Sequence, residues 1–174
     1  MQKSSRETLI RYAIYVIELI LVYALERAVN ARFGFGGLYF FITIPAFVSV
    51  ALFERENSGM IFGILSGVLV DYGHGKGIGA VAIVLCVFGY AIGLISNYIL
   101  CASVFVGMFV SVFLITAVEG IKVLCAVKDF NLWVEFLGGC FWKSLLVSVP
   151  IFIVTFYLNR VISYKFGGKE EIFN

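Results

Sequence analysis

Six apolar stretches separated by short polar segments constrain this chain more than any other feature. A membrane-spanning helix needs about 20 apolar residues, within a range of about 17–25. Of the 174 residues, 61% are hydrophobic and 14% are charged, whereas a soluble domain carries about 25% charged residues. We therefore expect a single all-α membrane domain, a polytopic protein whose helices cross the bilayer.

The expected helices follow the apolar runs. They cover residues 9–28, 38–53, 57–71, 78–100, 103–123 and 141–162. The second and third runs are short for a span, which leaves three alternatives: extension into flanking polar residues, a thinned bilayer, or incomplete crossing. We favour extension of the third helix through Glu56-Asn57-Ser58. The segment 124–140 could cross the membrane, dip into it or lie flat on its surface.

A glycine ladder that ends in an acid marks the third apolar stretch. Glycine recurs at every fourth residue, at Gly59, Gly63 and Gly67. Asp71 takes the next step of the repeat, and Gly89 and Gly93 repeat the spacing in the fourth stretch. Glycine inside a helix is unfavourable by about 1 kcal/mol, so glycines in register imply close helix contact. The two ridges could face each other within the chain, or they could form a docking groove for a helix of another protein.

Two of the acidic side chains in the apolar stretches are candidate sites. Asp71 precedes a turn rich in glycine, including Gly75 and Gly79. It could cap that turn by accepting backbone N–H bonds, remain solvated, or hold a proton or an ion. Glu18 lies near the middle of the first helix, where a carboxylate costs about 2.5–3.5 kcal/mol on insertion scales. We expect it to pair with a polar group on another helix, or to act in assembly or transport.

The sequence contains no pattern typical of a catalytic, metal-binding or nucleotide-binding site. His74 is the single histidine, and no Ser–His–acid, GxSxG, HExxH or Walker lysine motif occurs. We therefore expect a non-enzymatic protein without a cofactor or a metal. The formal charge of +2, with scattered basic residues, gives no reason to expect nucleic acid as a partner. Basic residues in both tails favour cytoplasmic termini.

The segment from Gly63 to Leu94 resembles the core of the rod shape-determining protein MreD family. The resemblance begins with the Gly63-x-x-x-Gly67-x-x-x-Asp71 helix. It continues with glycines four and eight residues after the acid and with a tyrosine in the long helix that follows. These positions are Gly75, Gly79 and Tyr90.

The resemblance implies a scaffold of the bacterial cell-elongation complex, in the cytoplasmic (inner) membrane, that supports rod shape and lateral peptidoglycan synthesis. Its direct partner would be an MreC-like single-pass membrane protein. Through this partner it would be linked to an MreB-like filament and to a synthase of the RodA and class-B transpeptidase type. The family fold is similar to the S-component of vitamin transporters. A substrate-binding, S-component-like transporter subunit is therefore the alternative.

Overall fold

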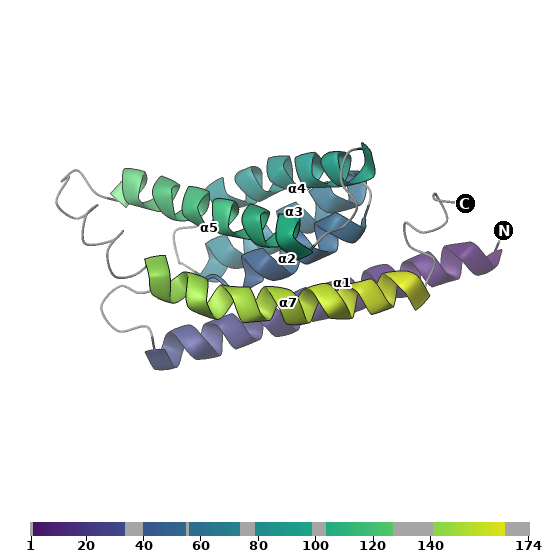
Figure 1. Ribbon diagram of the computed structural model, residues 1–174, viewed down its shortest axis with the longest axis horizontal. Coiled ribbons are helices and arrows are strands. Elements are labelled where there is room, and N and C mark those ends of the chain that lie inside the picture. The colour runs from purple at the N-terminus through teal and green to yellow at the C-terminus, as the bar shows by residue number, and fades with distance from the viewer. Residues whose placement is uncertain are drawn as a thin grey trace.

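The computed structural model describes residues 2–33, 40–54, 56–73, 79–98, 104–126 and 141–165. These residues form six helices and no strand, which confirms the all-α class. The helices are α1 (Gln2–Phe33), α2 (Thr43–Phe53), α3 (Glu56–Gly73), α4 (Ala80–Tyr98), α5 (Val104–Ala126) and α7 (Phe141–Lys165). In Figure 1, α7 runs alongside α1, and the start of α1 and the end of α7 lie at the same end of the bundle.

The ends of two short helices bear on the expectations from sequence. α3 begins at Glu56, as the extension alternative requires. α2 begins at Thr43, later than the expected start at residue 38, which lies outside the described residues. Pro45 fits inside the first turn of α2 because the first N–H groups of a helix have no intrahelical partner. Of the segment 124–140, residues 124–126 belong to the end of α5, and the rest lies outside the described residues.

α2 is the centre of the bundle. Every residue from Thr43 to Phe53 is buried, and α1, α3, α4, α5 and α7 all contact this helix. At 1.5 Å per residue its 11 residues span only about 17 Å, about half of a bilayer core. Neighbouring helices therefore supply the whole environment of α2, which is the condition under which a short helix is tolerated at membrane depth.

The glycine ridge of α3 packs directly on the backbone of α4. A Cβ atom added to Gly59 would lie 2.5 Å from the carbonyl oxygen of Gly89, and one added to Gly89 would overlap the Gly59 carbonyl in return. A Cβ at Gly63 would overlap the Leu85 carbonyl, and one at Gly67 would overlap Cα of Ala82. The two ridges thus face each other. The groove that a helix of another protein would need at these glycines is already filled by α4, which corrects the docking alternative. Gly93, further along α4, is also buried.

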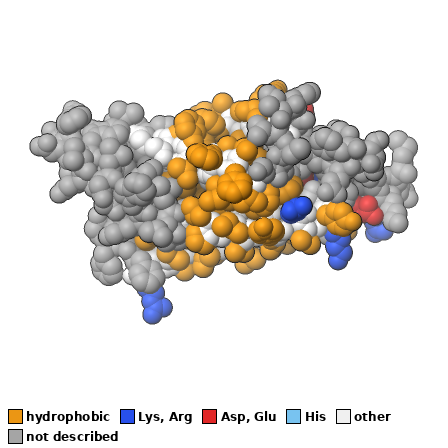
Figure 2. Space-filling model, in the orientation of Figure 1, with side chains coloured by type: hydrophobic (Ala, Val, Ile, Leu, Met, Phe, Trp, Pro, Cys, Tyr) orange, Lys and Arg blue, Asp and Glu red, His pale blue; other side chains and the backbone are white. Residues whose placement is uncertain are grey.

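The bundle places apolar side chains outside and several ionisable ones inside. The most exposed large apolar residues come from all the longer helices and include Leu9, Val68, Ile83, Phe109 and Val161. On the face shown in Figure 2, hydrophobic side chains form a band across the middle, and most of the Lys and Arg side chains lie nearer the ends. Buried polar residues include Arg11, Glu18, Glu26, Glu54 and Asn159. The outer faces are thus more apolar than those of a typical water-soluble helical bundle, while the interior combines an apolar core with buried polar groups.

Among the described residues, α1 over Arg6–Arg32 is the one helix both long and apolar enough to cross a membrane. The apolar parts of three other helices, Thr43–Phe53, Ala80–Ser96 and Val104–Val118, are shorter.

The α3–α4 contact generates a stability prediction. Gly63→Ala should lower the free energy of unfolding in detergent micelles by about 1–3 kcal/mol, because the added methyl group overlaps backbone atoms. The higher helix propensity of Ala opposes this loss by about 1 kcal/mol. This gain is smaller than the free-energy cost of forcing the two helices apart. Ile64→Ala, at an outward-facing position on the same helix, is the matched control and should change stability little. Equal or higher stability of Gly63→Ala would contradict the close contact.

Candidate functional site

One face of α1 carries four buried polar side chains. We call these the polar row: Arg11, Tyr15, Glu18 and Glu26. Their spacing of four, three and eight residues places them on a single helical face. Each is at most 8% exposed, although the opposite face of α1 is apolar and exposed. The polar row is therefore part of the interior, and its partners lie on other helices.

Arg11 forms a buried ion pair with Glu54, the residue that follows α2. Nε of Arg11 lies 2.9 Å from Oε1 of Glu54, and a second guanidinium nitrogen donates to Oε2 at 3.4 Å. Both side chains are less than one-tenth exposed. Glu54 lies in the short connection between α2 and α3, and its carboxylate turns inward at the end of α2. A carboxylate at a helix end next to other charges carries no sequence signal that distinguishes a buried partner from a solvated one.

Glu26 binds the backbone where α2 begins. Its Oε2 atom accepts the N–H groups of Ile42 at 2.8 Å and of Thr43 at 2.7 Å. The N-cap residue Ile42 has no side chain that could accept these bonds. A carboxylate at this position also faces the positive end of the helix dipole. One turn further along α1, Asn30 pairs with both the N–H and the carbonyl group of Phe40, at 2.7 and 3.0 Å.

Glu18 meets Asn159 of α7 in the interior. The Asn159 side-chain amide donates to Oε1 of Glu18 at 3.2 Å and contacts Oγ of Ser49 in α2 at 2.7 Å. The expected polar partner on another helix is therefore Asn159. The contact joins three helices at one point, because Ser49 belongs to the central helix. Nothing in the local sequence marks Asn159 as a buried partner, since it directly precedes Arg160 at the expected end of a span.

Serine hydroxyls from two other helices each bind one carbonyl group near an end of α2. Ser96 of α4 donates to the carbonyl oxygen of Leu52 at 2.7 Å, and Ser148 of α7 donates to that of Phe41 at 3.1 Å. Together with Glu26, these contacts pair backbone groups that have no water around them. The site is therefore a set of hydrogen bonds from neighbouring helices that hold the two ends of α2 in place.

Asp71 is a helix cap supplied by a neighbouring helix. Its Oδ2 atom accepts the N–H group of Ala82, in the first turn of α4, at 3.1 Å. Gly79 precedes α4 with a φ of +67°, a conformation that favours glycine, and its carbonyl accepts the N–H group of Ile83 at 3.1 Å. The geometry therefore fits the capping alternative for Asp71, although the bonded group belongs to the helix and not to the turn. Gly75 lies outside the described residues.

Tyr90 does not join this interior network. Its side chain is 43% exposed on the outer surface of α4. The structural role expected from the resemblance therefore has no contact in the interior to support it.

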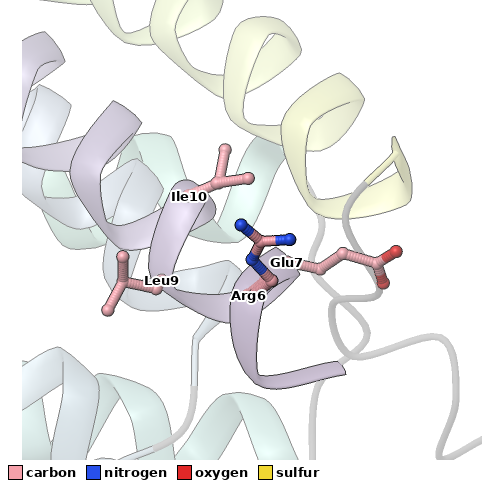
Figure 3. Close-up of a pocket in the computed structure, with 4 residues that line it drawn as sticks. All are labelled: Arg6, Glu7, Leu9 and Ile10. Atoms are coloured by element: carbon pink, nitrogen blue, oxygen red, sulfur yellow. The ribbon is translucent and has the colours of Figure 1, made fainter. Parts of the chain in front are cut away.

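Neither of two hollows lined by described residues is an enclosed cavity for a substrate, and these residues form no metal site. No group of three or more His, Cys, Asp and Glu side chains among them could hold a metal ion. An open hollow at the start of α1 is lined by Arg6, Glu7, Leu9 and Ile10, whose side chains radiate from one turn instead of converging (Figure 3). Between α5 and α7 a cavity of about 10 Å³ is close to the smallest that holds one water molecule.

Comparison with known proteins adds no family: no family model, curated protein or solved structure matches the chain.

The ion pair of the polar row generates a second prediction. Arg11→Leu or Glu54→Leu alone should lower the free energy of unfolding by about 3–5 kcal/mol, because each leaves one buried charge without its partner. The double variant should lose less stability than the two single variants together, since no charge is left unpaired. Unfolding in mixed micelles of the unsubstituted protein, the two single variants and the double variant measures the energy of coupling between the two side chains. Additive losses would show that the two side chains do not act as a pair.

Proposed function

We propose that this chain is a polytopic membrane protein and a non-enzymatic scaffold of the kind represented by the MreD family. In this role it binds an MreC-like single-pass protein in the bacterial cytoplasmic membrane, with both of its own termini in the cytoplasm. It thereby supports rod shape and lateral peptidoglycan synthesis, with an indirect link to an MreB-like filament and to a RodA and class-B transpeptidase synthase. The resemblance of Gly63 to Leu94 is the source of the family assignment.

The apolar outer surface, together with the burial of charged side chains, supports a membrane setting. Charged and amide side chains are buried and paired, while the outward faces of the longer helices carry Leu, Ile, Val and Phe. In water these outer faces would expose a large apolar surface, which is unfavourable. In lipid the same surface contacts apolar acyl chains at no such cost. α2 need not contact lipid at all because its neighbours enclose it. The other five helices then form an S-component-like bundle around it that meets the bilayer.

The closed interior is the single observation that favours a scaffold over a carrier. A small-molecule site needs about 300–1,000 Å³ lined by convergent polar groups. Most of the buried polar groups described here instead make contacts between helices, such as Arg11 with Glu54 and Glu26 with the start of α2. Function must then lie on the outer faces, where another helix can dock.

The outer face of α5 is the docking surface we assign to the single-pass partner. Three phenylalanines stand at every fourth residue and point outward: Phe105, Phe109 and Phe113. They are 76%, 78% and 60% exposed, respectively. Aromatic side chains provide large contact areas and dominate the energy of many interfaces. α5 packs mainly against α2 and α7. At the end of the row, Phe113 also meets the ring of Phe88 in α4 edge-on, so a partner helix along this row would lie beside α4 at that end.

Co-purification tests this assignment. Phe109→Ala should reduce recovery of a tagged MreC-like protein from co-expressing membranes at least several-fold, because it removes the most exposed ring of the row. Leu21→Ala, an equally outward position on α1, is the matched control and should leave recovery unchanged. Equal recovery from both variants, with both proteins folded, would remove α5 as the docking face. Failure of the unsubstituted protein to bind would remove the scaffold proposal.

Ligand binding tests the transporter alternative separately. The purified protein should bind riboflavin, thiamine and biotin no more tightly than an unrelated membrane protein, because its described interior lacks a cavity of the necessary size. Isothermal titration calorimetry in detergent makes the measurement. A nanomolar dissociation constant for any of the three would favour the transporter subunit.

A further inference from the structure

Glu18 differs from the other carboxylates of the interior in how its charge is compensated. Glu54 pairs with Arg11, and Glu26 accepts two N–H groups at the positive end of α2. Within the described residues, Glu18 accepts a hydrogen bond from the neutral amide of Asn159. An ionised carboxylate here would be buried beside an amide with no cation to balance it, which is costly in a membrane interior.

The titratable groups around Glu18 do not supply that cation. Tyr15 lies one turn before it on α1, and the Arg11–Glu54 pair lies beyond Tyr15. α2, which packs on the same face, contains no titratable side chain. On α3 the acids are at the helix ends, and on α4 and α5 the described segments 79–96 and 104–118 contain no Asp, Glu, Lys or Arg. On the described part of α7 the basic side chains are exposed: Arg160 and Lys165.

Two buried acceptor atoms of this contact lack a donor. They are Oε2 of Glu18 and Oδ1 of Asn159, and neither has a hydrogen-bond partner in the described structure. The two side chains already share one bond through their other polar atoms. A proton on Oε2 of Glu18 would turn that atom into a donor and provide the bond that Oδ1 lacks. One proton thus removes two unsatisfied acceptors and the uncompensated charge together.

We infer that Glu18 and Asn159 form a buried proton-binding site, in which a neutral Glu18 carboxyl group donates its proton to Oδ1 of Asn159. The acid and the amide then close a ring of two hydrogen bonds between α1 and α7. Ser49 supports the amide from α2 through its 2.7 Å contact. The occupant is a proton and not a metal ion, because the site offers a single carboxylate.

Proton binding makes the α1–α7 contact dependent on pH. While the proton is bound, the contact is neutral and fully paired. When it is lost, an anion and a second acceptor face each other in an apolar interior. The folded protein then holds one proton more than the unfolded protein at neutral pH, so stability falls as the pH rises. This inference concerns the interior and does not depend on the identity of the docking partner.

Infrared spectroscopy and unfolding together test the site in the purified full chain. The protein at neutral pH should show a protonated-carboxyl C=O band that is absent from Glu18→Gln. Gln is the isostere of the neutral acid, since it can accept from Asn159 and donate back to it. Glu18→Gln should therefore match the unsubstituted protein in stability at neutral pH and should lose the part of its pH dependence that the proton causes.

Glu26→Gln is the matched control on the same helix. Its carboxylate accepts two N–H bonds and needs no proton, so the band should persist in this variant. Absence of the band from the unsubstituted protein, or the same pH dependence in Glu18→Gln, would overturn the proposal. Stability that depends on Na⁺ or K⁺ at constant pH and ionic strength would also overturn it, because a metal ion would then be the occupant. This last measurement uses the unsubstituted protein and does not require that any variant folds.

Discussion

The enclosure of α2 is the constraint on which the rest of the structure depends. An 11-residue helix buried on every side has no water for the backbone groups at its ends. Side chains from other helices must therefore pair with them, and they do so from α1, α4 and α7. Glu26 of the polar row is buried for this reason, because it pairs with the backbone where α2 begins.

The same enclosure separates an interior that determines the fold from an exterior that is free to bind. α3 and α4 are joined backbone to backbone through Gly59, Gly63, Gly67 and Gly89, so this contact cannot serve another protein. Most of the buried polar groups make contacts between helices. The outer surface is apolar and includes the exposed phenylalanine row of α5.

The candidate site could be predicted from the sequence only in part. Glu18 is conspicuous because a carboxylate interrupts an apolar run, and a polar partner on another helix follows from its cost. The identity of that partner does not follow: Asn159 is 141 residues away. Glu54 stands in a charged stretch of the sequence, and it pairs with Arg11 across 43 residues. Burial of a charge is set by what packs on it, and no local pattern encodes that.

The sequence by itself determined the all-helical class, the approximate positions of the helices and the close approach of backbones at the glycine ridges. These properties depend on hydrophobicity and side-chain size along one segment at a time. Only the tertiary structure decided that the two ridges face each other, that α2 is the enclosed helix, and which acids have which partners. These features depend on which helix surfaces meet in space. Many arrangements of the helices share the same apolar pattern, and the pairing of buried polar groups selects one of them.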